Sequence, residues 1–124
     1  MSSETVVYIV DDDESVRLST AFVLETVGHR VETYADGAAF LSAVSPEQRA
    51  VAIFDLRMPG IDGAELLLAV RARGWSIPVI LVSGHTDETV SAEVLAAGAF
   101  DVLEKPYEDN QLLLVIDRAL EGTG

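Results

Sequence analysis

Five short hydrophobic segments recur along the chain roughly two dozen residues apart, and a segment with helical spacing of apolar residues follows each one. The first, third and fourth are almost continuously apolar, which is typical of strands buried on both faces of a sheet. The segment at residues 30–34 alternates apolar and polar side chains instead, which favours an edge strand. The predicted strands are Val6–Val10, Arg30–Tyr34, Ala50–Phe54, Val79–Ser83 and Asp101–Glu104.

The intervening helical segments carry signals for their ends. Asp36, Asp87 and Asp109 stand at the starts of three of them and are predicted N-caps, while glycine ends the first, third and fourth. The predicted helices are Ser15–Val27, Gly37–Val44, Ala64–Arg73, Glu88–Ala97 and Asn110–Glu121. Strands that alternate with helices indicate a parallel sheet covered by helices. The predicted fold class is therefore α/β, a doubly wound five-stranded parallel sheet with five helices.

The spacing of apolar residues also predicts which helix faces meet the sheet. In the first helix the predicted core stripe is Val16, Thr20, Val23 and Val27. In the last helix it is Leu112, Val115, Ile116, Ala119 and Leu120. Leu113 and Leu114 lie at the margin of that second stripe or outside it, and contiguous exposed leucine usually marks a contact site. The alternative for Leu113 is a wider stripe in which it packs beside Ile116.

Composition limits the possible functions. The 124 residues are 49% hydrophobic, enough for one domain over residues 1–124 with a core of about 5–120. A formal charge of −13 argues against direct nucleic-acid binding, which needs clusters of Lys and Arg. No apolar run reaches the roughly 20 residues of a membrane span, and the first residues lack the pattern of a signal peptide. We therefore expect a cytoplasmic protein without a membrane anchor.

Charged residues follow three of the predicted strands directly. The first strand ends on Asp11-Asp12-Asp13-Glu14, the third on Asp55, and the fifth on Lys105, the only lysine in the sequence. The carboxyl ends of parallel strands share one edge of the sheet, which is where such sheets bind ligands. Clustered carboxylates need a hard cation between them, and Mg²⁺ prefers such oxygen ligands. A lone ammonium beside the cluster would suit a phosphate.

The same charged residues could instead serve purely structural roles. The acidic run could be a solvated first helical turn, favoured by the helix dipole, and Lys105 could be an ordinary surface lysine. Because four consecutive acids exceed what a cap requires, we assign Asp13 and Glu14 to capping and Asp11 and Asp12 to metal binding. A dehalogenase-type phosphatase would need a carboxylate at Arg57. A flavodoxin-type cofactor domain would need phosphate-binding donors where the acidic run stands.

The residues at these strand ends match a known family. The chain resembles the receiver domain of bacterial two-component response regulators, a flavodoxin-like (βα)5 fold, in the FixJ-like branch, over residues 5 to about 120. The motifs that carry the resemblance are Asp11-Asp12, the run Asp55-Leu56-Arg57-Met58-Pro59-Gly60 with Asp62-Gly63, Ser83-Gly84-His85, and Glu104-Lys105-Pro106-Tyr107. Each is weak alone, but four in order at matching strand ends are specific.

The resemblance implies a signalling receiver rather than an enzyme, with a sensor histidine kinase as partner. It implies that Asp55 accepts the phosphoryl group and pairs with Lys105 beforehand. Mg²⁺ would be bound by Asp12, Asp55 and the backbone carbonyl of Arg57, with Asp11 reaching it through water. Lys105 and the hydroxyl of Ser83 would contact the phosphoryl oxygens. The alternative is a degenerate receiver that acts as an interaction module without being phosphorylated.

Two departures from the family pattern concern the output of the signal. An aromatic residue is usual at the position of Val102, and Phe100 is the candidate to replace it. Many FixJ-like regulators continue into a DNA-binding output domain, so the chain is either a single-domain regulator or lacks that domain. Receivers of this kind commonly form homodimers through the fourth helix, fifth strand and fifth helix. Here Leu113 and Leu114, with Val90 and Val94, are predicted to supply that surface.

Overall fold

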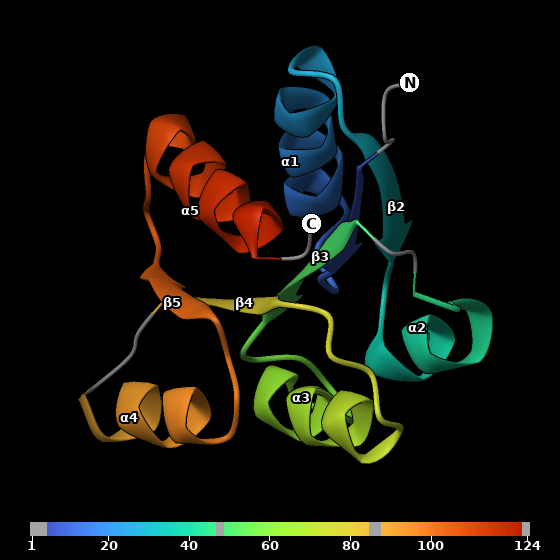
Figure 1. Cartoon of the computed structure of the whole chain (residues 1–124), viewed down its shortest axis with the longest axis vertical. Helices are drawn as coiled ribbons and strands as arrows, with labels where there is room; N and C mark the ends of the chain where they lie inside the picture. The colour runs from blue at the N-terminus through green and yellow to red at the C-terminus, as the bar shows by residue number, and fades with distance from the viewer. Residues whose placement is uncertain (1–4, 47–48, 85–87, 123–124) are drawn as a thin grey trace.

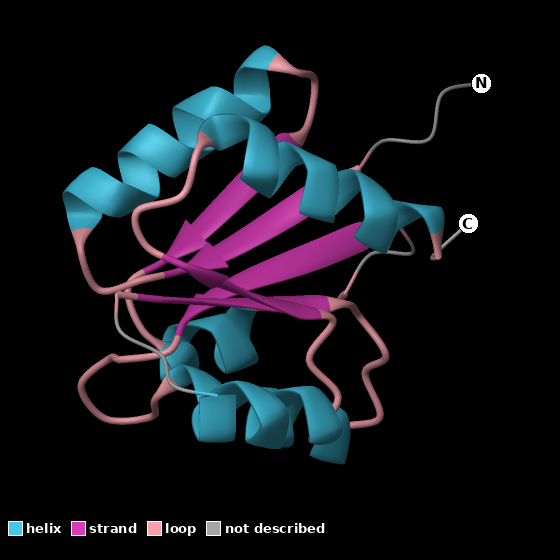
Figure 2. Cartoon of the chain, turned by 90° about the vertical axis from the view of Figure 1, so that its left-hand side faces the viewer, coloured by secondary structure: helices cyan, strands magenta, loops and turns pink. Residues whose placement is uncertain are grey.

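The computed structural model describes residues 5–46, 49–84 and 88–122. A parallel sheet in the order β2-β1-β3-β4-β5 forms the middle layer of the fold. Helices α1 and α5 cover one face of the sheet, and α2, α3 and α4 cover the other (Figures 1 and 2). The elements are β1 (Val6–Val10), α1 (Glu14–Thr26), β2 (Arg30–Tyr34), α2 (Gly37–Ala43), β3 (Ala50–Asp55), α3 (Gly63–Ala72), β4 (Val79–Ser83), α4 (Glu88–Ala96), β5 (Asp101–Glu104) and α5 (Asp109–Glu121). The predicted fold class is confirmed.

The predicted strands are confirmed, with β3 one residue longer than expected. Strand β2 is an edge strand, as its alternating pattern indicated. In the pairing of β1 with β3, Val10 lies opposite Phe54, so the two residues that follow them, Asp11 and Asp55, are neighbours. Strand order thus brings the first two charged strand ends together at the centre of the sheet.

Helix boundaries differ from the prediction by one residue because of the capping contacts. Asp13 is the N-cap of α1, and its side chain accepts a hydrogen bond from the backbone N–H of Val16 at 3.2 Å. Helix α3 begins at Gly63 because Asp62 caps it and forms a reciprocal capping box with Glu65. Asp36 caps α2 as predicted, accepting from the backbone N–H of Ala39 at 2.8 Å.

The prediction of Asp109 as an N-cap was wrong. Asp109 is the first residue of α5, and Glu108 is the N-cap. The backbone N–H of Glu108 donates to Oε1 of Gln111 at 2.8 Å, which fixes the helix start one residue earlier. The predicted cap at Asp87 lies outside the described residues. None of the helices among the described residues is long and apolar enough to cross a bilayer.

Two hydrophobic clusters fill the layers on either side of the sheet. Under α2, α3 and α4, the fully buried ring of Phe40 makes edge-to-face contacts with Tyr8, Tyr34, Phe54 and Trp75. Under α1 and α5, the predicted stripe of α5 is confirmed, since all five of its residues are buried. Leu113 packs against this cluster and is half-buried, in agreement with the alternative of a wider stripe.

The predicted stripe of α1 is only partly correct, because Val16, Thr20 and Val23 are half-buried but the prediction left out the most buried residue of the helix. Leu24 is its fully buried residue and Ala21 packs beside it, whereas Val27 is 53% exposed. Successive residues lie about 100° apart around a helix. The face of α1 that meets the sheet runs through Ala21 and Leu24, next to the predicted face through Val16 and Val23. Val27 is the C-cap and lies past the last turn that contacts the sheet.

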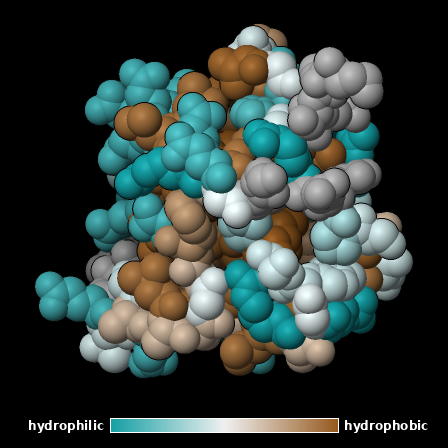
Figure 3. All heavy atoms as spheres, viewed as in Figure 1, coloured by the Kyte–Doolittle hydropathy of each residue, from teal (hydrophilic) through white to brown (hydrophobic). Residues whose placement is uncertain are grey.

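Val94 also differs from its predicted place on an output surface. It is only 4% exposed and belongs to the core cluster under α4. Val90 is partly buried against the same cluster. Leu114, in contrast, is 62% exposed, as expected. On the face seen in Figure 3, apolar side chains reach the surface among polar ones.

Candidate functional site

Three carboxylates converge at the carboxyl edge of the sheet. One oxygen each from Asp11, Asp12 and Asp55 lies within 4.8 Å of the others. Asp11 is 3% exposed and Asp55 is 9% exposed, whereas Asp12 faces solvent. The three carboxylates of Asp11, Asp12 and Asp55 form a concave, negatively charged site that is open to solvent, called here the acidic cup.

Asp55 is held by the turn that follows it. The backbone N–H of Leu56 donates to the carbonyl of Val82 at 2.8 Å, and the N–H of Arg57 donates to Oδ1 of Asp55 at 3.2 Å. Gly63, at the start of α3, packs so closely that a Cβ there would lie 2.5 Å from the carbonyl oxygen of Asp55. The helix therefore fixes the backbone of the candidate acceptor.

Lys105 reaches the acidic cup from the end of β5. Its Nζ lies 3.8 Å from Oδ2 of Asp55 and 3.7 Å from Oδ2 of Asp11. The predicted contact with Asp55 is present, and Asp11 is a second partner that the sequence did not reveal. The backbone N–H of Lys105 donates to the carbonyl of Ser83 at 2.7 Å, and the Lys105–Pro106 peptide bond is cis. One ammonium thus serves two buried carboxylates.

The charges of the cup are incompletely balanced. Burial raises the pKa of Asp55, and the negative charge of Asp11 raises it further, against the opposing effects of Lys105 and the Arg57 N–H. A carboxylate with a raised pKa in a set of three gains from an added cation. The donor set contains only hard oxygen ligands, so the residues present fit Mg²⁺.

The remaining predicted residues lie at the same edge. Ser83 ends β4 and is fully buried. The side chain of Arg57 is exposed, as expected for a residue that contributes through its backbone. The use of its carbonyl as a metal ligand stays a prediction. His85 of the third motif lies outside the described residues.

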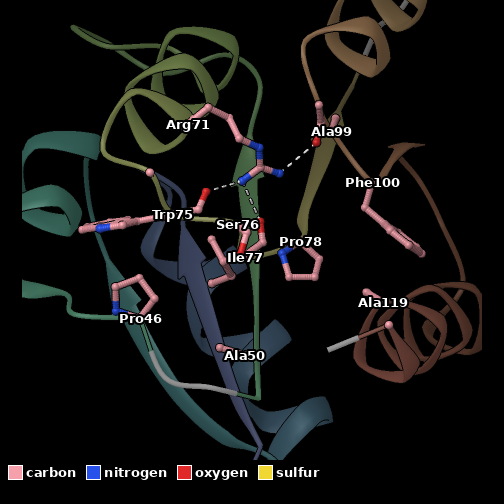
Figure 4. Close-up of a pocket in the computed structure, with 13 residues that line it drawn as sticks. Pro46, Ala50, Arg71, Trp75, Ser76, Ile77, Pro78, Ala99, Phe100 and Ala119 are labelled. Atoms are coloured by element: carbon pink, nitrogen blue, oxygen red, sulfur yellow. Dashed lines mark hydrogen bonds between the residues drawn. The ribbon is translucent and has the colours of Figure 1, made fainter. Parts of the chain in front are cut away.

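Phe100 does not replace the missing aromatic residue. Its backbone N–H donates to the carbonyl of Val79 at 2.7 Å, at the amino end of β4, whereas Ser83 ends that strand four residues on. Four residues of strand span about 13 Å. Phe100 is exposed and lines a groove of about 850 Å³ at the opposite edge of the sheet (Figure 4). Val102 packs against the core beneath α4.

Arg71 organises that opposite edge, a role that no pattern in the sequence indicated. Its guanidinium donates hydrogen bonds to the carbonyls of Trp75, Ile77 and Gly98 at 2.8–2.9 Å (Figure 4). These contacts tie α3 to the loops that precede β4 and β5. The titratable cluster and the groove therefore lie at opposite ends of the strands.

A second arginine missed by sequence reasoning lies near the cup. Arg17 of α1 donates from Nη1 to the backbone carbonyl of Asp11 at 2.7 Å. Its side chain is only 15% exposed. The sequence shows only an arginine six residues after a strand-end carboxylate, and its burial depends on the rotation of α1, which the sequence pattern did not fix.

Comparison with known proteins agrees with this geometry. The sequence model of the response regulator receiver domain matches residues 7–117. The transcriptional regulatory protein FixJ of Azorhizobium caulinodans is 42% identical over 114 residues, which are 92% of this chain and 54% of that protein. The chain spans little more than half the length of the FixJ proteins that it matches.

Solved structures give the same result. The crystal structure of FixJ-N has a TM-score of 0.87 and 40% identity, covering 98% of this chain and 96% of that one. Full-length FixJ from B. japonicum has a TM-score of 0.89 and 35% identity, covering 98% of this chain and 60% of that one. The resemblance inferred from the strand-end motifs is confirmed. The chain belongs to the response regulator receiver domain family and is a receiver of the FixJ type.

Proposed function

We propose that Asp55 accepts a phosphoryl group from a sensor histidine kinase in a Mg²⁺-dependent reaction, and that phosphorylation switches an interaction surface. The observation that carries the proposal is the convergence of Asp11, Asp12 and Asp55 within 4.8 Å, with Lys105 bridging the two buried acids. A degenerate receiver is less well supported, because the acceptor, the acidic ligands and the lysine are all present.

Chemically, the Asp55 carboxylate is the nucleophile. One of its oxygens forms a bond to phosphorus while the bond from phosphorus to the kinase histidine breaks, and the electron pair stays on the histidine nitrogen. Asp12, Asp55 and the Arg57 carbonyl would hold Mg²⁺, with Asp11 acting through water, and the ion would supply positive charge that offsets the repulsion between the carboxylates and the phosphoryl oxygens. Lys105 then exchanges its carboxylate contacts for the phosphoryl oxygens, and the Ser83 hydroxyl donates to them.

Asp55→Asn should abolish phosphorylation completely, because the amide keeps the shape of the side chain and removes the nucleophile. Both proteins are incubated with acetyl phosphate and Mg²⁺, and the base-labile product is measured on a phosphate-affinity gel. Asp109→Asn, which changes an exposed carboxylate on α5, is the matched control and should be labelled like the parent. Labelling of the Asp55→Asn protein would refute the assignment, and an unlabelled parent would favour the degenerate receiver.

We further propose a role as a signalling module in the cytoplasm, without a separate substrate of its own. Receiver domains serve such roles, and the FixJ relatives are named as transcriptional regulators. The charge of −13 makes direct DNA binding by this chain unfavourable. In the longer FixJ relatives, DNA binding would therefore fall to the part of their length that this chain does not span.

A phosphorylation-dependent homodimer is the output that we expect. Exposed apolar side chains stand on α4, just before β5 and on α5, namely Leu95, Phe100 and Leu114. Beryllofluoride, a phosphoryl mimic, should convert the monomer to a dimer in sedimentation experiments. The protein is used at tens of micromolar, which is about the dissociation constant of a moderately stable dimer. Leu114→Glu should prevent dimerisation, and Leu68→Glu, at a similarly exposed leucine of α3, should not. A dimer that tolerates Leu114→Glu would exclude this surface.

A further inference from the structure

The β1–α1 loop carries Asp11 and Asp12, the two acids that are proposed to bind metal. The hydrogen bonds of the strand and of the helix do not satisfy every backbone group of this loop. Strand β1 ends at Val10 and α1 begins at Glu14, with Asp13 as its cap. The carbonyl of Asp11 falls between these elements and belongs to neither. A buried carbonyl without a donor is costly, so some side chain or water must supply one.

Arg17 supplies that donor. Its Nη1 lies 2.7 Å from the carbonyl oxygen of Asp11, and its guanidinium is largely buried. The other polar atoms of Asp11 are also engaged: the N–H donates to the Tyr34 carbonyl, Oδ1 accepts from the Asp13 N–H, and Oδ2 faces Lys105. The Asp11 carbonyl belongs to the peptide unit that joins Asp11 to Asp12. By holding it, Arg17 sets the direction in which the exposed Asp12 leaves the loop.

The kind of contact matters for the charge of the site. Arg17 donates to a backbone carbonyl, and its carboxylate contact is with exposed Glu14 at 4.0 Å. Its guanidinium therefore adds positive charge beneath the loop without occupying an oxygen of the acidic cup. A salt bridge to Asp12 or Asp55 would instead compete with a bound cation.

One turn further on, the same face of α1 contacts the turn after β5, which carries Lys105 and Tyr107. Thr20 is three residues after Arg17, so their side chains are neighbours on the helix surface. The Thr20 side chain is hydrogen-bonded to Tyr107, which lies two residues after Lys105 and packs against the cluster beneath α1 and α5. Figures 1 and 2 show α1 and α5 side by side on the same face of the sheet.

We propose that Arg17 and Thr20 are positioning residues of the phosphorylation site: consecutive turns of α1 fix the loop of the metal ligands and the turn of Lys105. The inference rests on the proposed function for its biological meaning. It adds that α1, besides covering the sheet, sets the geometry in which Asp12 and Lys105 meet an incoming phosphate.

The first test measures Mg²⁺ binding by the unphosphorylated protein, followed by NMR of the backbone amides. Arg17→Met should weaken Mg²⁺ binding by about tenfold, the usual loss when an outer-shell partner is removed, and should speed exchange of the Asp13 amide. Arg118→Met removes the same charge from an exposed salt bridge on α5 and should leave both quantities unchanged. Affinity within about twofold of the parent, with unchanged Asp13 exchange, would overturn the role of Arg17.

Two further controls guard against a pure charge effect and misfolding. Arg17→Lys keeps the charge and should bind Mg²⁺ with intermediate affinity, because a shorter side chain without the planar fork holds the carbonyl poorly. A nearby positive charge by itself repels Mg²⁺. Full parental affinity in this variant would therefore mean that the planar fork is not needed to hold the carbonyl, and it would contradict positioning by the guanidinium. Thermal unfolding of each variant is recorded, and only folded proteins are compared.

The Thr20 contact has its own reporter. Because Lys105 is the only lysine in the sequence, a protein labelled with ¹⁵N-lysine gives one backbone amide signal, from the turn itself. Thr20→Val and Tyr107→Phe should each speed hydrogen exchange of this amide and leave Mg²⁺ affinity close to that of the parent. Unchanged exchange in both would remove Thr20 from the proposal. None of these measurements requires phosphorylation, so failure to label Asp55 would refute the proposed function while leaving the positioning result readable.

Discussion

Gly63→Ala should destabilise the protein by about 1–3 kcal/mol, the usual cost of forcing an extra methyl group into a packed site. The new Cβ would lie 2.5 Å from the carbonyl oxygen of Asp55 and 2.9 Å from Cα of Leu56. Both are backbone atoms of the strand end and cannot rotate away as a side chain can. Relief must come from moving α3 or the acceptor strand, so phosphorylation should fall together with the unfolding temperature.

Gly37→Ala is the matched control for this change. Gly37 is the first residue of α2, as Gly63 is of α3. A Cβ at position 37 would meet a methyl group of Leu66 at 3.2 Å, and a flexible side chain can shift by a few tenths of an ångström. We expect its free energy of unfolding to change by no more than about 1 kcal/mol. Equal losses in the two variants would show that the contact with the acceptor strand is not the cause.

Asp55→Asn should stabilise the metal-free protein at pH 7 by on the order of 1 kcal/mol, since it removes a buried charge beside Asp11. For a protein of this size that corresponds to roughly 4 °C in the unfolding temperature. Burial and the charge of Asp11 raise the pKa of Asp55 above its ordinary value of 3.8. Ionisation of Asp55 therefore opposes folding.

The pH dependence follows from the direction of this pKa shift. A carboxyl group with a raised pKa in the folded state binds its proton more tightly there, so its stabilising effect is fully present below 3.8. That effect is lost as the pH rises through the folded-state pKa. The advantage of the Asn variant should accordingly shrink as the pH falls toward 3.8. An advantage that is constant with pH would contradict the assignment of the unfavourable charge to Asp55.

Mg²⁺ should reverse the order of stability. At a concentration about one hundred times its dissociation constant, a ligand that binds only the folded state contributes about 2.7 kcal/mol. The parent should gain this amount, whereas the Asn variant, with one anionic ligand fewer, should gain less. Thermal unfolding with and without Mg²⁺ measures both effects in one series, and equal gains in the two proteins would argue against Asp55 as a ligand.

The strands and the meeting of their charged ends could be predicted from sequence because the physical signals are local and redundant. A buried parallel strand must be apolar on both faces, and a parallel sheet brings all carboxyl ends to one edge, so Asp11, Asp55 and Lys105 were expected at the same edge. Their separations were not predictable, because the division of the Lys105 charge between two acids depends on how deeply each acid is buried.

Helix orientation was harder to predict. In α1, both the stripe through Val23 and the one through Leu24 have acceptable spacing, and packing against the cluster shared with α5 and the sheet selects the second. The same uncertainty hid Arg17, because a polar residue on the sheet-facing side looks like surface until the rotation of the helix is known. Val94 was misplaced for a related reason, since an isolated valine in a short helix does not reveal whether it faces core or solvent.

The aromatic cluster around Phe40 has a consequence for spectroscopy. Trp75 is the only tryptophan, and it lies at the amino edge of the sheet, remote from the acidic cup. An ion or phosphoryl group bound at Asp55 could not quench its emission by contact. Phe40 touches both Trp75 and Phe54, the residue before Asp55. The emission of Trp75 would therefore not change merely because the site at Asp55 is occupied. It would change only if binding rearranges the packed aromatic rings that connect the two places.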